Sequence, residues 1–535
     1  MTAPGETDAA ALAARLVVGL SGPEPTPAEE AWLARWRPAG VLLFARNVAD
    51  AAQLTALCRR LCGLLPADGE IVADHEGGPV SALAAAVGRP PGPACLGLAG
   101  DPGLTRRVHR ETAARLRECG LTRVLAPCAD VLVEPRNPVI GGRAFGADPE
   151  LVAAHVAAAV GGLREGGLRA CLKHWPGHGG TRGDSHDAAV SAGGGAVAGP
   201  FVAGLAAGAD AVMVGHLPDP EARDESRGVP LPATLAPTVL ARLRRLAGPP
   251  SLLVFADDIT MGALRPAMAA LGVAPGAPAG GPASARPARP APGTVAGLLE
   301  PEELTLPWLA ALAQAGCDRL LCRGIPWRAL PLPAGGPPAT AAAPAGLAGG
   351  AAIARAPSPA WPEAPVYAEA RARALQAAGG DPLPAGVERL LWLDCTAGDR
   401  WGEAAALQAR LADRFVMVQR VGAGTGAPAP EETAGFVRAA RGGAALLVTT
   451  HRPLAAAWGS ALRGVAWGDG AGGALALGHP SLGEALAGAL PAAWRVTVLP
   501  ELSAEMLDRA LGAGGGAGGC RNGGPDGAGR PTAAD

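Results

Sequence analysis

The residues best suited to chemistry lie in one polar stretch, CLKHWPGHGGTRGDSHDAAV, which spans residues 171–190. Lys173 and His174 close an apolar run, and the PGHGG segment after them disfavours a helix and favours a tight loop. Asp184 and His186 follow, two residues apart. A carboxylate can orient an imidazole, whose ordinary pKa of about 6.5 suits proton transfer near neutral pH. The spacing therefore predicts an acid–base pair.

Lys173 is the only lysine in the chain, because the other 45 of the 46 basic residues are arginines. A compact ammonium and a planar guanidinium bind partners with different geometry, so one does not simply replace the other. A single lysine within the most polar loop of an arginine-rich chain indicates a specific function for its ammonium group.

The elements that must position these residues are short apolar runs alternating with longer segments of helical spacing. The strand candidates are residues 16–20, 40–45, 70–74, 123–128, 169–174, 211–216, 251–257 and 317–322. The helical segments include 51–64, 104–118, 149–164, 235–246 and 303–315. Eight alternations predict an α/β fold with a (β/α)8 TIM-type barrel, whose chemistry is expected where the strands end.

Polar residues do follow the ends of most predicted strands. They are Arg46 and Asn47, Asp74 in DHEGG, Arg143 and Asn137 in NPVIGGRAFG, Lys173 and His174, His216, and Asp257 with Asp258. Parallel strands bring these ends to one face of a barrel, so the pattern predicts a polar pocket there. Asp74, Arg143, Lys173 and His174 supply donors and acceptors suited to a polyhydroxylated ligand.

Asp257 closes the apolar strand in FADDITMG, where a carboxylate can attack an electrophilic carbon and form a covalent intermediate. Side chains alternate along a strand, so only one of Asp257 and Asp258 can face the pocket. We expect the other, Asp258, to be structural, for example as a helix N-cap.

Metal binding is the competing use of the histidines. His174 with His178, or Asp184 with His186, has a spacing seen among metal ligands. The first predicted strand ends in GLSG, without the HxH pair of metal-dependent amidohydrolase barrels. We therefore predict no metal and no cofactor. His178 is left open between a structural hydrogen bond and a substrate contact.

Composition excludes several other functions. The net charge is −2 with both signs interspersed, which argues against nucleic acid and membrane surfaces as partners. No signal peptide and no apolar run long enough to span a bilayer is recognised, and ten scattered cysteines without CxxC pairs favour reduced thiols. The expected location is cytoplasmic and the expected partner is a small molecule, while the oligomeric state stays open.

Composition shifts also divide the chain. Residues 1–328 are expected to form the barrel, interrupted at 262–300 by a disordered Pro/Ala-rich insertion, and 329–365 an interdomain linker. Residues 366–511 contain a second alternation, with strands at 388–394, 414–419, 444–450, 474–478 and 494–499, which predicts a smaller α/β sandwich. The Gly-rich tail, 512–535, is expected to be disordered.

Taken together, these blocks resemble glycoside hydrolase family 3, in its β-N-acetylhexosaminidase branch. The segment from Lys173 to His186 is similar to the family motif KHFPGHGxTxxDSH, with Trp175 in place of Phe. GVLLFARN, DHEGG, NPVIGGRAFG, VMVGH, PATL and FADDITMG match further family blocks in the same order. The resemblance covers about residues 12–326 and, more weakly, the region beyond 380.

The resemblance implies a retaining exo-glycosidase that removes terminal β-linked N-acetylglucosamine, with peptidoglycan fragments as the usual substrates. It implies Asp257 as nucleophile and His186 as general acid/base assisted by Asp184. It also implies that Asp74, Arg143, Lys173 and His174 bind the sugar. A histidine acid is unusual, because retaining glycosidases generally use two carboxyl groups.

This chain departs from the family pattern after the third strand, where DQEGGRVQR is usual. Pro79 and Ala82 replace both arginines, which leaves the preferred sugar open. Phosphorolysis, another sugar specificity, and a non-catalytic sugar-binding protein remain the alternatives.

Overall fold

The computed structural model describes residues 6–134, 137, 139–181, 197–224, 228–248, 252–276, 298–332, 364–367, 369, 370 and 373, and the backbone of five later strands. Within these residues, no helix is both long enough and apolar enough to cross a bilayer. The eight cysteines in this part of the chain are free thiols, and all but Cys62 are buried.

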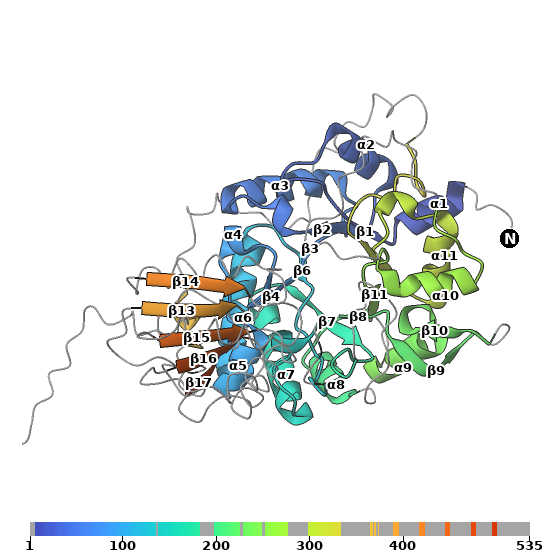
Figure 1. Ribbon diagram of the computed structural model, residues 1–535. Helices are drawn as coiled ribbons and strands as arrows, with labels where there is room; N and C mark the ends of the chain where they lie inside the picture. Colours follow the sequence, from blue (N-terminus) through green and yellow to red (C-terminus); the bar gives the residue numbers. More distant parts are fainter. Residues whose placement is uncertain are drawn as a thin grey trace, which may run out of the picture.

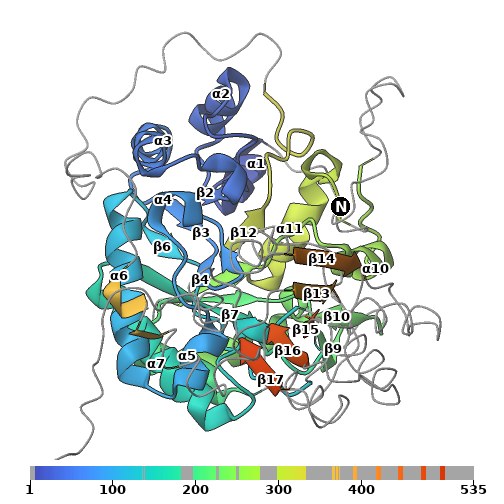
Figure 2. The ribbon, with the colours of Figure 1, turned by 60° about the vertical axis from the view of Figure 1, so that its left-hand side comes forward.

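Eight parallel strands close into a barrel in the order β1-β12-β11-β8-β7-β6-β3-β2 (Figures 1 and 2). They are β1 (Leu16–Gly19), β2 (Gly40–Leu43), β3 (Glu70–Ala73), β6 (Arg123–Val124), β7 (Arg169–Trp175), β8 (Ala211–Val214), β11 (Leu253–Ala256) and β12 (Arg319–Cys322). Each coincides with one of the eight predicted strand segments, with β7 one residue longer than predicted, so the (β/α)8 prediction is confirmed.

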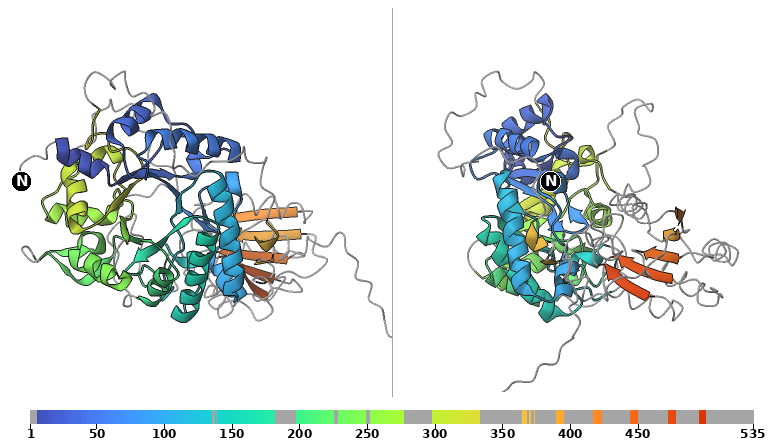
Figure 3. Two further views of the ribbon diagram at one scale, coloured as in Figure 1. Left: turned by 180° about the vertical axis from the view of Figure 1, so that it is seen from behind. Right: turned by 90° about the vertical axis from the view of Figure 1, so that its left-hand side faces the viewer.

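Helices surround the strands, as the view from behind shows (Figure 3). They are α1 (Glu6–Ala13), α2 (Pro27–Trp36), α3 (Ala51–Leu64), α4 (Ala84–Val87), α5 (Pro93–Ala99), α6 (Pro102–Glu118), α7 (Pro149–Glu165), α8 (Gly199–Ala206), α9 (Pro237–Ala247), α10 (Arg265–Ala270) and α11 (Leu306–Ala315). The long helices begin where the sequence supplies caps. Asp101 and Asp148 each accept a backbone N–H at the first turn of α6 and α7, and a proline follows each.

One residue from nearly every strand fills the barrel interior. These residues are Val17, Leu42, Val72, Leu125, Cys171, Met213, Phe255 and Leu321, all nearly or fully buried. Because side chains alternate along a strand, the residue two positions further on points the same way. Asp74, Lys173 and Asp257 follow Val72, Cys171 and Phe255 by two residues each, at the carboxyl ends of β3, β7 and β11.

Two hairpins and several short turns were not predicted from the sequence. The first hairpin pairs β4 (His75–Gly77) with β5 (Val80–Ser81), and the second pairs β9 (Pro218–Arg223) with β10 (Pro230–Pro232). The first follows β3 directly and carries most of the DHEGG block. Gly77 has φ +97°, and a Cβ there would lie 2.4 Å from the carbonyl oxygen of Pro91, so only glycine fits this turn.

The disordered insertion was predicted at 262–300, and its predicted first boundary is wrong because the barrel continues past residue 262. Residues 262–264 form a 3-10 turn and α10 follows, with Leu264 and Met268 fully buried in the core. At the other end, Leu299 is fully buried too. These buried apolar residues were not predicted because the surrounding sequence is rich in proline and alanine. Residues 277–297 lie outside the described part of the chain.

The expected linker, 329–365, likewise begins inside the barrel. Leu330 is fully buried, and its carbonyl oxygen accepts a hydrogen bond from the indole of Trp32 at 2.7 Å. At its far end, Tyr367 is 1% exposed and its hydroxyl lies 2.8 Å from that of Thr112 on α6. The residues between 332 and 364 lie outside the description.

A second sheet contains five parallel strands in the order β14-β13-β15-β16-β17 (Figure 1). They are β13 (Arg389–Asp394), β14 (Met417–Gly422), β15 (Ala444–Thr449), β16 (Gly472–Leu477) and β17 (Arg495–Leu499). The sequence predicted all five, with β14 placed three residues too early. The helices expected between them, and the tail from 512, fall outside the described residues.

Candidate active site

Lys173 lies at the centre of a buried set of charges at the carboxyl ends of the barrel strands. Its side chain is almost completely buried, and Nζ lies 2.5 Å from Asp74 Oδ1 and 2.5 Å from Glu76 Oε1. Burial by itself lowers the pKa of Lys173, but the two carboxylates outweigh it and raise the pKa above the ordinary 10.5. The ammonium therefore stays charged at neutral pH.

Arg143 joins the same set from the loop after β6. Its Nε and Nη2 donate to the two carboxylate oxygens of Glu76 at 3.0 and 2.7 Å, a bidentate pair. Nη2 also lies 3.2 Å from Nε2 of His174. Despite complete burial, which would raise it, the pKa of Glu76 is lowered to about 2 by Arg143 and Lys173.

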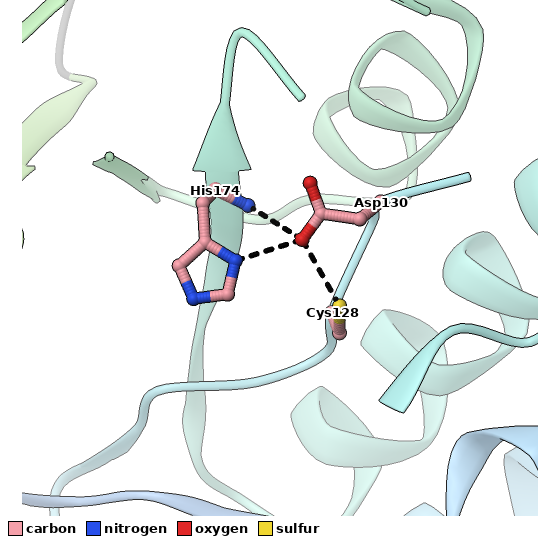
Figure 4. Close-up of side chains that lie close together, drawn as sticks. All are labelled: Cys128, Asp130 and His174. Carbon is pink, nitrogen blue, oxygen red and sulfur yellow. Dashed lines mark hydrogen bonds and ion pairs between the residues drawn. The ribbon is translucent and has the colours of Figure 1, made fainter. Parts of the chain in front are cut away.

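His174 is held from its other side by Asp130, which follows β6 and is fully buried (Figure 4). Asp130 Oδ2 lies 2.7 Å from His174 Nδ1 and accepts the backbone N–H of His174 at 3.2 Å. Because Nδ1 faces a carboxylate and Nε2 faces the Arg143 guanidinium, the consistent tautomer carries its proton on Nδ1 and presents Nε2 as an acceptor.

Lys173 and His174 are consecutive, yet both side chains reach this network. The pairing of β7 with β8 shifts register between Leu172 and Trp175, so the strict alternation of a strand ends before the functional pair. The peptide bond between Lys173 and His174 is cis.

Cys128, Asp130 and His174 place a sulfur, an oxygen and a nitrogen within 4.8 Å of one another, a donor set that could hold a metal ion. Here Asp130 Oδ2 accepts from the Cys128 thiol at 3.2 Å as well as from His174 (Figure 4). These are hydrogen-bond distances, and burial followed by Asp130 raises the pKa of the Cys128 thiol well above 9.0. The cluster is therefore accounted for as a hydrogen-bonded support for His174.

His178 does not join His174 as a ligand pair. Its Nδ1 lies 2.7 Å from the Thr181 hydroxyl, and its backbone N–H donates to Asp130 Oδ1 at 2.6 Å. Burial lowers the pKa of His178 to about 4. These contacts favour the structural interpretation that the sequence left open.

Asp257 follows directly after β11, at the carboxyl end of that strand. Its backbone N–H donates to the Val214 carbonyl at 3.0 Å, and its Oδ1 accepts the N–H of Asp258 at 2.8 Å. Asp258 is held in a local turn, where its Oδ1 accepts from the hydroxyl and N–H of Thr260 at 2.8 and 3.1 Å. Asp258 thus closes a turn and caps no helix, which corrects the expected cap.

His216 supports this segment from the end of β8. Its Nε2 lies 2.9 Å from the Asp258 carbonyl oxygen, and its Nδ1 lies 2.9 Å from the Thr234 hydroxyl. Since a carbonyl only accepts, Nε2 carries the proton and Nδ1 accepts from Thr234. His216 therefore tethers the backbone beside Asp257.

The two strand-end asparagines are structural as well. Asn47 is fully buried and donates to the carbonyls of Leu20 and Gly22. Asn137 donates to the His178 carbonyl at 2.7 Å and the Thr181 carbonyl at 3.2 Å, which secures the start of the loop after β7. Arg46 also binds backbone carbonyls, those of Leu20 and Arg323.

The structure thus brings together four of the five predicted site residues that it describes, Asp74, Arg143, Lys173 and His174, with Asp257 on the same face. Asp184 and His186 lie in residues 182–196, outside the described part. Sequence reasoning missed Glu76 and Asp130. Both follow strand ends, Glu76 two residues after Asp74 and Asp130 two residues after Cys128, which was the available signal.

A (β/α)8 barrel with paired charges buried at the carboxyl ends of its strands defines an enzyme of the TIM-barrel class. The model of the Glycosyl hydrolase family 3 N terminal domain matches residues 12–275. A beta-hexosaminidase of Stenotrophomonas maltophilia (strain K279a) is 36% identical over 260 residues, covering 46% of this chain and 75% of the relative. A beta-hexosaminidase of Xylella fastidiosa (strain 9a5c) is 34% identical over 262 residues, 47% of this chain and 76% of the relative.

The chain belongs to glycosyl hydrolase family 3 and is a glycoside hydrolase. A solved family 3 beta-N-acetylglucosaminidase from Paenibacillus sp. str. FPU-7 has a similar fold, with a TM-score of 0.67 and 22% identity. That similarity covers 95% of this chain and 96% of the other.

Proposed function

We propose that the protein hydrolyses terminal, non-reducing β-linked N-acetylglucosamine with retention of configuration. The observation that supports this proposal is the ion pairing of Lys173 with Asp74 and Glu76 at the carboxyl ends of the barrel strands, the same end at which Asp257 follows β11. The relatives named beta-hexosaminidase support the sugar specificity.

In the first step the Asp257 carboxylate attacks the anomeric carbon, and a glycosyl–aspartate ester forms as the glycosidic bond breaks. The departing oxygen takes a proton from His186, which Asp184 orients. In the second step His186 removes a proton from water, the water oxygen attacks the anomeric carbon, and Asp257 leaves as a carboxylate. The anchoring of the loop start by Asn137 supports this role of the loop after β7.

The sugar-binding residues are Asp74, Arg143, Lys173 and His174. Asp74 offers carboxylate oxygens to hydroxyl groups, while Lys173 and Arg143 donate from charged groups. His174 lies beside Arg143, from which its Nε2 accepts a hydrogen bond, and so helps to position the guanidinium. Charged donors make stronger hydrogen bonds than neutral ones, which suits discrimination among sugar hydroxyls.

A histidine acid has a physical rationale in this pocket. Asp74, Glu76 and Asp257 already bring three carboxylates to the strand ends. If the general acid were another carboxylic acid, it would add a further negative charge close to Asp257 after it gave up its proton. A neutral imidazole adds none, and its ordinary pKa lies near neutrality.

Peptidoglycan fragments are the proposed substrates and the cytoplasm the proposed location. Pro79 and Ala82, which stand where the family usually has arginines, keep the preference for the aglycone and for the sugar open to measurement. We include phosphorolysis as the alternative outcome of the same experiment, since a neutral histidine tolerates a phosphate anion better than a carboxylate does.

The test is a panel of aryl β-glycosides and muropeptides assayed with and without phosphate. We expect hydrolysis of the β-N-acetylglucosaminides, with a loss of at least about 10³-fold in Asp257→Ala. His186→Ala should lose less on a substrate with a good leaving group, because that leaving group needs no proton. Absence of turnover on every N-acetylglucosaminide contradicts the proposal. If turnover requires phosphate, the reaction is phosphorolysis and not hydrolysis.

A further inference from the structure

Among the described carboxylates of this network, Glu76 contacts both Lys173 and Arg143, and its own side chain is fully buried. We propose that Glu76 is a positioning residue, which holds Lys173 and Arg143 side by side so that both can bind the sugar. This inference rests on the proposed function of Lys173 and Arg143. Glu76 itself is 3% exposed, with a side chain that is fully buried, so it acts through its two partners.

The geometry gives each partner a defined contact. One oxygen of Glu76 is shared by Lys173 Nζ, at 2.5 Å, and Arg143 Nη2, at 2.7 Å. The other oxygen accepts from Arg143 Nε at 3.0 Å. Two cations that share one carboxylate oxygen must lie close to each other, and without the negative charge between them they would repel.

Glu76 is also fixed from the backbone side. It lies in the middle of β4, a three-residue strand paired with β5 and buried along its whole length. The next residue, Gly77, packs against the Pro91 carbonyl at a distance that excludes a side chain. The carboxylate therefore has little freedom to follow its partners, and the partners instead adopt the positions that it sets.

Every element around Lys173 contributes to its charge state. Asp74 follows β3, Glu76 lies on β4, Arg143 comes from the loop after β6, and His174 follows on β7 itself. Cys128 and Asp130 lie beyond Arg143 and His174. Burial and Arg143 lower the pKa of Lys173, whereas Asp74 and Glu76 raise it. When Glu76 is removed, only Asp74 raises the pKa of Lys173, while burial and Arg143 still lower it.

The sign of the expected change follows. With Glu76 present, the pKa of Lys173 lies above 10.5, so Lys173 keeps its proton through the alkaline range in which the protein is handled. In Glu76→Gln the amide keeps the shape but loses the charge. We expect the pKa of Lys173 to fall by about 1–3 units, the usual effect of a neighbouring opposite charge.

The chain offers a direct measurement because Lys173 is its only lysine. Full-length protein grown with lysine labelled with carbon-13 at Cε gives a single side-chain resonance, which reports the protonation of Lys173. We expect Lys173 to titrate at a lower pH in Glu76→Gln than in the wild-type protein, with both titrations followed upward from neutral pH for as long as the protein stays folded. Circular dichroism at each pH verifies that the protein is folded.

Glu70→Gln is the matched control. Glu70 starts β3, the strand just before β4, is buried like Glu76 and also pairs with an arginine, Arg123, at 3.0 Å. It lies at the opposite end of the barrel, so its loss should cost stability without moving the Lys173 resonance. An unchanged Lys173 titration in Glu76→Gln, or an equal shift in Glu70→Gln, overturns the proposal.

If Glu76→Gln does not fold, Glu76→Asp is the second variant. It keeps the charge on a shorter side chain, and we expect a smaller fall in the pKa of Lys173. No fall in that folded variant also overturns it.

Binding of N-acetylglucosamine, measured by calorimetry, separates this inference from the proposed function. We expect Glu76→Gln to bind at least ten-fold more weakly than the wild-type protein at neutral pH, because Lys173 and Arg143 lose the carboxylate that holds them together. If the wild-type protein binds no N-acetylglucosamine, the proposed function fails while the resonance still reports on Glu76. If the wild-type protein binds N-acetylglucosamine and Glu76→Gln binds it equally tightly, the inference about Glu76 is contradicted, while the proposed function is not.

Discussion

The carboxylate of Asp130 lies 2.7 Å from Nδ1 of His174 and holds that ring with Nε2 directed toward Arg143. Asp130, which no motif singled out, thus decides which nitrogen of His174 accepts the hydrogen bond from Arg143. The contact also links the loop after β6 to β7, since Asp130 binds the backbone of both His174 and His178.

Asp130→Asn should weaken sugar binding more than its small change in shape suggests. An amide can present its NH2 to Nδ1, which favours the other tautomer and turns a proton toward Arg143. We expect KM for an aryl β-N-acetylglucosaminide to rise about ten-fold, equivalent to about 1.4 kcal/mol, with a smaller fall in kcat. Steady-state kinetics measures the split. Cys128→Ala, which removes only the thiol contact with Asp130, serves as the control and should stay within about three-fold of wild type.

Asp258 and Asp257 should respond in opposite ways to the same substitution. Asp258→Asn keeps the oxygen that binds Thr260 and should retain activity within a few-fold. Asp257→Asn removes the attacking carboxylate and should lower kcat by at least about 10³-fold. Equal losses in the two variants, measured on folded protein, would show that the assignment of the pocket-facing residue is wrong.

Buried histidines predict a loss of stability on mild acidification. Burial lowers the pKa of His109 to about 4 and that of His75 to about 3 from the ordinary 6.5. Below pH 6.5 the unfolded chain therefore binds protons that the folded chain does not, so the free energy of unfolding falls as pH drops from 6.5 toward 4. Urea midpoints at pH 7, 6, 5 and 4 test this. His109→Gln should flatten the dependence, and an unchanged slope would contradict the assignment.

The carboxylates of the network add a second, more acidic dependence. The pKa of Glu76 is about 2 in the folded protein against an ordinary value of 4.5, so its contribution to stability is complete above 4.5. That contribution is lost as pH falls from 4.5 toward 2. Comparing acid unfolding of wild type with Glu76→Gln checks the sign: the variant should be less stable at neutral pH and show a shallower acid transition.

Tyr367 should anchor the segment before the second sheet to the barrel. Its hydroxyl contacts Thr112, the Arg115 guanidinium lies 5.4 Å from its ring centroid, and nearby Glu369 pairs with Arg107. Tyr367→Phe removes one buried hydrogen bond and should cost about 1 kcal/mol. Limited proteolysis should cut near residue 367 faster in Tyr367→Ala than in Tyr367→Phe. Identical cleavage of both variants and wild type would argue against anchoring.

The sequence was sufficient for the barrel because short apolar runs alternate with longer segments of helical spacing. It also located Asp74, Lys173 and Asp257, since strand ends are readable as positions where polarity returns. It failed where local composition misleads. The Pro/Ala-rich stretch conceals Met268 and Leu299 in the core, because burial depends on distant partners.

Glu76 and Asp130 illustrate a different limit. Their importance comes from contacts across 67 residues to Arg143 and across 44 residues to His174, which no local pattern contains. Alternation predicted that Asp257 and Asp258 differ in role, but it could not predict that Thr260 is the partner of Asp258.

The most direct test of the account is to trap the covalent intermediate. A fluorinated N-acetylglucosaminyl fluoride that slows the second step should add one sugar mass to the wild-type protein, and peptide mapping should locate it on Asp257. Asp258→Asn should be labelled in the same place, and Asp257→Asn should not be labelled. A label on any other residue, or turnover that yields the inverted α-anomer, would contradict the claim that Asp257 is the nucleophile.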